Sequence, residues 1–242
     1  MKSNTIILLF STAIFLISCK QEVPEKPKVI YNTETTAKAQ TAVDTAQIEV
    51  ADLPIHIPGT NYLIHPIGDL NIYGGSKVKY DASSSAATAA GFQISNYDQG
   101  EITGYLRNLK FQLIGSDSIK ALSEKRLLIQ SATFLKSVSE KTKQQIMVYA
   151  LADMDTNQDG RLDTSDIKSL YLSEMGGERL TKMSEDFQEL LDWNLIEANN
   201  HLYFRTIEDT NKNGEFDKYD VLHYHFIDLS TKDWKVSEYN PI

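Results

Sequence analysis

Two segments of this chain, 54 residues apart, repeat one spacing of oxygen-bearing side chains. Counted from residue 155 in the first and residue 209 in the second, aspartate or asparagine occupies positions 1, 3, 5, 9 and 12. These residues are Asp155, Asn157, Asp159, Asp163 and Asp166 in the first segment, and Asp209, Asn211, Asn213, Asp217 and Asp220 in the second. Only a tightly curled backbone brings side chains at such positions to one point. This spacing therefore restricts the local backbone more than any other feature of the sequence.

A curl of this kind suits a hard cation that takes about six to eight oxygen ligands, and calcium is the ion with these preferences. Gly160 and Gly214 at position 6 permit the curl, because glycine adopts positive φ at little cost. The backbone carbonyls of Arg161 and Glu215 at position 7 add one ligand to each set. We therefore expect two bound calcium ions, one in each segment.

The two segments resemble the calcium loops of EF-hand and dockerin proteins. Position 12 is Asp166 or Asp220 rather than a bidentate glutamate, which favours structural loops over a signalling switch. Leu162 and Phe216 at position 8 are expected to tie each loop to a core. The alternative is a pair of turns whose side chains bond only to their own backbone. Since the first loop has four carboxylates and the second has three, we expect weaker binding in the second.

The beginning of the chain has the form of an export signal. Residues 1–18 contain Lys2 and an apolar run that is short for a membrane span, as in secretory signal peptides. The run ends in Leu16-Ile-Ser-Cys19, which resembles the lipobox of bacterial lipoproteins. This resemblance implies that Cys19 carries diacylglycerol with fatty acids such as palmitate and anchors the chain to a membrane. Lys20 after it favours the outer membrane, on either its periplasmic or its outer surface; an ordinary cleaved signal is the alternative.

Composition divides the remainder into a tether and one domain. Residues 19–50 contain Pro24, Pro27 and many polar residues, with few large apolar side chains before Ile48, so this segment cannot bury enough surface to offset its ordering entropy. Residues 51–242 are enough for one domain with a full core. The net charge of -9 makes nucleic acid an improbable partner.

The domain is expected to be mainly β. Short aliphatic and aromatic runs alternate with clusters of Gly, Asn, Asp and Ser. The runs are 62–66, 106–114, 127–134, 146–151, 170–172, 202–207 and 222–227. The 54-residue repeat extends beyond the loops and aligns Tyr149 with Tyr203 and Leu172 with Phe226. We interpret both loops as connections between strands; a dockerin-like module would need flanking helices instead.

Residues 170–204 combine a strand, a Gly turn, a Leu-Thr step, a Trp strand and the run Asn200-His-Leu-Tyr-Phe204. This order resembles a blade of TolB-type β-propellers, with weaker copies at 109–134 and 222–234. The resemblance implies repeated antiparallel sheets over about residues 105–240. Room for only three or four blades favours an incomplete or open arrangement, with a sandwich as the competing architecture.

The expected function is non-catalytic: a lipid-anchored envelope protein that binds two structural calcium ions and has a role in binding or envelope organisation, with an envelope protein or a glycan as partner. The alternative is an envelope hydrolase or a carbohydrate-binding protein with a calcium-stabilised fold. Trp193 and Trp234 could stack on a sugar, but their matching places in the repeat favour packing. His223 and His225 have the spacing of paired metal ligands but lack a third partner.

Overall fold

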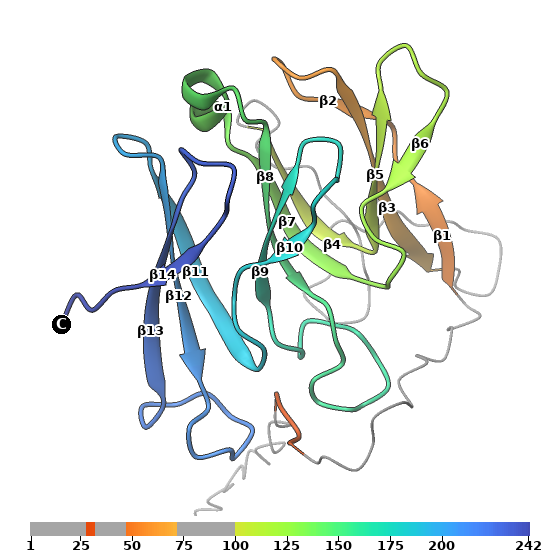
Figure 1. Cartoon of the computed structure of the whole chain (residues 1–242). Coiled ribbons are helices and arrows are strands. Elements are labelled where there is room, and N and C mark those ends of the chain that lie inside the picture. The colour runs from red at the N-terminus through yellow and green to blue at the C-terminus, as the bar shows by residue number, and fades with distance from the viewer. Residues whose placement is uncertain (1–27, 32–46, 72–99) are drawn as a thin grey trace, which may run out of the picture.

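The computed structural model describes residues 28–31, 47–71 and 100–242 (Figure 1). Cys19 and the leader expected over residues 1–18 lie outside these ranges. Strand β1 begins at Gln47, so the first sheet starts four residues before the expected domain boundary at residue 51. Within the described ranges, no helix is long and apolar enough to cross a membrane.

Three antiparallel sheets make up the structure, and none of them closes on itself. Sheet A has the order β1-β3-β5-β6, with β2 paired to β3. Its strands are β1 (Gln47–Ala51), β2 (Ile55–His56), β3 (Tyr62–Asn71), β5 (Asn108–Leu113) and β6 (Ile119–Ala121). Sheet B has the order β10-β9-β8-β7-β4. Its strands are β4 (Glu101–Leu106), β7 (Leu128–Phe134), β8 (Ile146–Ala152), β9 (Ser169–Glu174) and β10 (Thr181–Lys182).

Sheet C has the simple order β11-β12-β13-β14. Its strands are β11 (Gln188–Ile196), β12 (His201–Glu208), β13 (Val221–Asp228) and β14 (Val236–Glu238). The one helix in the described ranges is α1 (Lys136–Thr142), which joins β7 to β8. It ends at Lys143, whose left-handed backbone (φ 64°) turns the chain into β8.

Sheet B lies between the other two, as Figure 1 shows, and its strand β8 is buried along its whole length. Side chains of a strand point alternately to the two faces of its sheet. Met147, Tyr149 and Leu151 accordingly join the core shared with sheet A. The residues between them face sheet C and join a second core with residues such as Leu202, Phe204 and Ile227. The described residues therefore form two large hydrophobic cores, one on each side of the middle sheet, besides a small cluster of Leu128, Ala152 and Leu162.

The expectation of a mainly β fold is confirmed, and each of the seven apolar runs overlaps a strand. The loops at 155–166 and 209–220 connect β8 to β9 and β12 to β13, as expected. Strands rather than helices flank both loops, and the two loops lie at the same end of the sheets (Figure 1).

The repeat does not extend to strand register. Tyr149 pairs with Tyr171, so an offset of 54 would pair Tyr203 with His225. Tyr203 instead pairs with Phe226, a shift of one residue. Neighbouring residues of a strand point to opposite faces of the sheet. The shift of one residue therefore puts the side chains of β13 on the faces opposite to those that the repeat implies.

Candidate functional site

The first loop closes on itself through hydrogen bonds from its own amides to its acidic and amide side chains. Asp155 at position 1 accepts from the amides of Asp159 at 3.2 Å and Gly160 at 2.8 Å. Asn157 at position 3 also accepts from Asp159, at 3.0 Å. Asp159 at position 5 accepts from Arg161 at 3.0 Å, so the side chains at positions 1, 3 and 5 all bond to amides of their own loop.

Asp166 at position 12 joins the two ends of this loop. One of its oxygens accepts from the amides of Thr156 at 2.8 Å and Asn157 at 3.4 Å. The other accepts from the amide of Asp163 at 2.9 Å. Asp163, at position 9, accepts from Ser165 at 2.8 Å. The carboxylate at position 12 therefore holds positions 2, 3 and 9 together.

The second loop repeats this arrangement. Asp209 accepts from the amides of Asn213 at 3.2 Å and Gly214 at 2.7 Å. Asp220 at position 12 accepts from Thr210 at 3.2 Å and Asp217 at 2.7 Å. The amides of Asn213 and Glu215 bond to the side chains of Asn211 and Asn213 at 2.9 and 2.8 Å.

The backbone conformations of the two loops also agree at their unusual positions. At position 4, Gln158 and Lys212 have φ of 55° and 56°. At position 6, Gly160 and Gly214 have φ of 82° and 85°. Only glycine adopts such an angle at position 6 without strain. The two loops therefore share one local structure, although outside the patterned positions their sequences agree only at position 2, where both have threonine.

Among the described residues, no cationic side chain forms an ion pair with a loop carboxylate. In the same part of the chain, no three or more His, Cys, Asp and Glu side chains gather closely enough to hold a metal ion by themselves. Each expected ligand set also includes asparagine and a backbone carbonyl. An oxygen that accepts one amide keeps a second lone pair, so the donor set fits a hard cation.

Asp166 is the most buried of these carboxylates, with only 1% of its surface exposed. Burial raises its pKa to about 6, and the charge of Asp155 acts in the same direction, while the bonds from the loop amides lower it. Burying a charged carboxylate without a cation is unfavourable. A divalent ion in this loop would remove that penalty.

The two loops have the same exposure at position 7 but differ in burial at position 8. Arg161 and Glu215 at position 7 are exposed. Leu162 at position 8 is buried against Leu128 and Ala152, as expected of a residue that ties the loop to a core. Phe216 is only half-buried. The first loop is therefore more firmly packed against the sheet than the second.

A segment that the sequence analysis assigned to the tether lies against both loops. Residues 28–31 occupy the space between them at the lower end of the view in Figure 1. Val29 is 98% buried there (2% exposed). Burial and the neighbouring carboxylate of Asp209 raise the pKa of Tyr31 to about 12. The sequence signal was the apolar run Val29-Ile30-Tyr31 within a polar stretch, too short to be read as an element.

The other side chains considered as sites do not join the loops. Trp234 is buried in the second core and Trp193 packs against that core, so packing explains both, as expected. His223 lies between two glutamates, 3.0 Å from Glu208 and 3.2 Å from Glu238.

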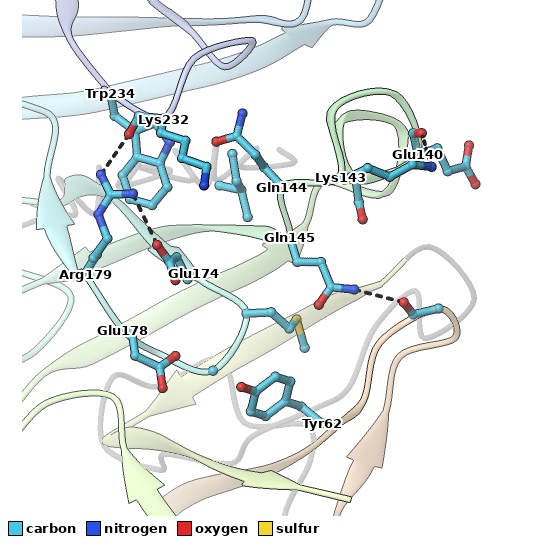
Figure 2. Close-up of a pocket in the computed structure, with 15 residues that line it drawn as sticks. Tyr62, Glu140, Lys143, Gln144, Gln145, Glu174, Glu178, Arg179, Lys232 and Trp234 are labelled. Carbon is cyan, nitrogen blue, oxygen red and sulfur yellow. Dashed lines mark hydrogen bonds and ion pairs between the residues drawn. The ribbon is translucent and has the colours of Figure 1, made fainter.

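An open pocket of about 570 Å³ lies at the end of the sheets opposite the loops (Figures 1 and 2). Arg179 stands 4.3 Å above the Trp234 ring and donates to Glu174 at 3.2 Å and to the carbonyl of Lys232 at 2.9 Å. Gln145 donates to the carbonyl of Gly59 at 3.0 Å, on the other side of the pocket. None of the expected calcium ligands lines this pocket, whereas Trp234, considered above for stacking on a sugar, does. Comparison with protein-family models, curated proteins and solved structures finds no match to this chain.

The left-handed backbone at position 6 gives a direct test of the first loop. We expect Gly160→Ala to reduce the free energy of unfolding by about 1–2 kcal/mol, the cost of a Cβ in this conformation. No atom lies within 4 Å of the added Cβ, so a clash would not contribute. Urea denaturation measures the change, and Ser165→Ala, an exposed position of the same loop, is the matched control. Equal stability of the two variants would contradict this loop conformation.

Proposed function

We propose that this chain is a lipid-anchored protein of the bacterial cell envelope whose β-rich domain binds two structural calcium ions and has a binding or organising role rather than a catalytic one. The observation that carries the proposal is the agreement between the two loops. Two segments that differ at most of their unpatterned positions share the same side-chain-to-amide bonds and nearly the same φ angles at positions 4 and 6. A shared ligand requirement explains this agreement.

Each proposed ion would hold together the two ends of the loop that joins a pair of strands, β8 with β9 or β12 with β13. Asp155 and Asp166 stand at the two ends of the first loop, and Asp209 and Asp220 at those of the second. Without a cation, charges a few ångströms apart repel each other by roughly 1 kcal/mol per pair even in water. An ion that binds both ends stabilises the closed loop and, with it, the pairing of the flanking strands. Extracellular modules bind calcium at about 0.1–1 mM, so the level outside a cell would keep such sites largely filled.

The envelope location rests on the sequence. Leu16-Ile-Ser-Cys19 supports lipidation, and Lys20 supports outer-membrane sorting, on whichever side of that membrane. We further propose that the three sheets are an open form of a propeller-type repeat. The blade expected over residues 170–204 is divided, with β9 and β10 in sheet B and β11 and β12 in sheet C. The support for a propeller-type repeat is instead that sheet C and strands β7 to β10 each follow the up-and-down order of a blade.

Glycan binding is a second candidate, which the outer face of sheet C favours. This face carries a cluster of half-buried rings that no described element covers. The rings belong to His201, Tyr203, Tyr224, Phe226 and Tyr239, with neighbouring centroids 5.0 to 6.2 Å apart. Arg205 lies on the same face and forms a bidentate ion pair with Asp192. Flat rings beside polar groups suit the apolar faces and hydroxyls of a sugar.

Calcium should stabilise the folded domain. If the ion binds only the folded state, it adds about 2.7 kcal/mol at 100 times its dissociation constant. We therefore expect calorimetry to find two sites and the melting temperature to rise with calcium. Asp155→Ala should abolish the tighter site, whereas Asp117→Ala, at an exposed turn, should leave both unchanged. A wild-type protein that melts at the same temperature in calcium and in chelator would rule out the structural role.

The lipid anchor predicts where the protein is found. In a Gram-negative host, the wild-type chain should sediment with membranes and remain there after a high-salt wash. Cys19→Ser should move it to the soluble fraction, because the chain has no other cysteine to acylate. Unchanged membrane association of the variant would contradict the anchor.

If the aromatic face of sheet C binds sugars, polysaccharide in a native gel should slow the migration of the protein. In native gels that contain a panel of neutral and acidic polysaccharides, the wild-type protein should migrate more slowly in at least one. Tyr203→Ala should lose most of this effect, because it removes a central ring of the cluster on which a sugar would stack. Tyr219→Ala, at an exposed loop position with 70% of its surface accessible, is the control. Unchanged mobility in every gel would remove this candidate.

A further inference from the structure

Residues 28–31 bond to main-chain groups of both loops at once. The amides of Lys28 and Val29 donate to the carbonyl of Gly214 in the second loop, at 2.6 and 3.3 Å. The amide of Ile30 donates to the carbonyl of Thr156 in the first loop, at 2.9 Å. The Thr156 hydroxyl donates in return to the carbonyl of Lys28 at 2.8 Å. These four bonds connect position 6 of the second loop to position 2 of the first.

Side chains of the segment add to these main-chain bonds. The Lys28 ammonium lies 3.2 Å from the carboxylate of Glu189, which also accepts the amide of Lys168 at 2.9 Å. The side chain of Gln158 donates to the carbonyl of Ile30 at 3.0 Å. The Tyr31 ring stands 5.9 Å from that of Phe187 and 5.8 Å from the ammonium of Lys212. The segment thus contacts residues of both loops, of the β10–β11 connection and of strand β11.

We propose that the space between the two loops is a docking site for residues 28–31 of this same chain, and that docking and calcium binding strengthen each other. This inference rests on the proposed calcium sites. Residues 28–31 are called the clamp below.

The reason for the coupling is the position of the acceptors. The amides of Thr156 and Gly214 bond to Asp166 and Asp209, which are expected calcium ligands, and the carbonyls of the same two residues accept the clamp. A loop that opens without its ion would carry those carbonyls away, and the clamp would lose its acceptors. By linkage, the clamp must strengthen calcium binding by the factor by which calcium strengthens docking.

The clamp also connects the two ions. Within the described ranges, no hydrogen bond joins loop 155–166 directly to loop 209–220, whereas the clamp bonds to both. Calcium in one loop would fix half of the docking site and so favour docking, which would then help to order the other loop. The two sites should therefore bind calcium with positive cooperativity.

Hydrogen exchange on the full lipidated chain in detergent tests the docking. The amides of residues 28–30 should be protected in calcium and lose most of that protection in chelator, while amides of β8 stay protected in both. Equal protection of residues 28–30 under both conditions would overturn the coupling.

Calorimetry with calcium tests the reciprocal effect. Val29→Gly removes the buried side chain of the clamp without adding charge, and we expect it to weaken calcium binding at both sites about tenfold, within the usual range of allosteric couplings. It should also abolish cooperativity. Leu53→Gly, at a side chain with 80% of its surface exposed, is the matched control and should change nothing. Ile30→Pro, which removes the amide that donates to Thr156, should repeat the effect of Val29→Gly.

The outcomes separate the two proposals. Two calcium sites whose affinities are unchanged in Val29→Gly and Ile30→Pro would overturn the clamp and leave structural calcium in place. A wild-type chain that binds no calcium would overturn both.

Discussion

Burial of the middle sheet on both faces is the constraint on which the rest of this structure depends. Along β8, alternate side chains enter two different cores, so the strand cannot slip by one residue without moving its apolar groups between them. Fully burying one such side chain stabilises the fold by about 1.5–3 kcal/mol. Fixing β8 in this way also fixes the end of the strand, where Ala152 and Leu162 pack and the first loop begins. The position of Asp166 follows from the packing of the sheets.

The loops balance two uses of the same oxygens. Amides of the loop bond to each carboxylate and give it a defined rotamer, while no cationic side chain among the described residues pairs with the negative charge. A loop whose side chains bond to its own amides can therefore also bind a cation, because the amides and the ion would use different lone pairs of the same oxygens. The raised pKa of Asp166 expresses the cost of that uncompensated charge.

The sequence predicts the strands well where a run of apolar residues is long enough to fill a core, as at Leu202–Ile207. It predicts the two loops because their oxygen spacing is a local property. It fails for α1, whose seven residues bury only Val138, and for the edge strands β2 and β10, which are two residues each. The sequence also does not predict the pairing register of β12 and β13. The pairing of Tyr203 with Phe226 depends on how the sheets pack, which the local pattern does not contain. The docking of Val29 was missed because its contacts lie more than 120 residues away.

Where residues 28–31 dock decides how the domain would stand on a membrane. Lys28 follows Cys19 by nine residues (28 − 19), which reach at most about 30 Å when fully extended. Gln47, where β1 begins, follows it by 28 residues (47 − 19), a reach of at most about 100 Å. With a lipid on Cys19 and the segment docked, the loop end of the sheets would stay within about 30 Å of the bilayer, which favours an orientation with the pocket of Figure 2 farther from it. Release of four residues would more than triple the height available to the domain and free its orientation.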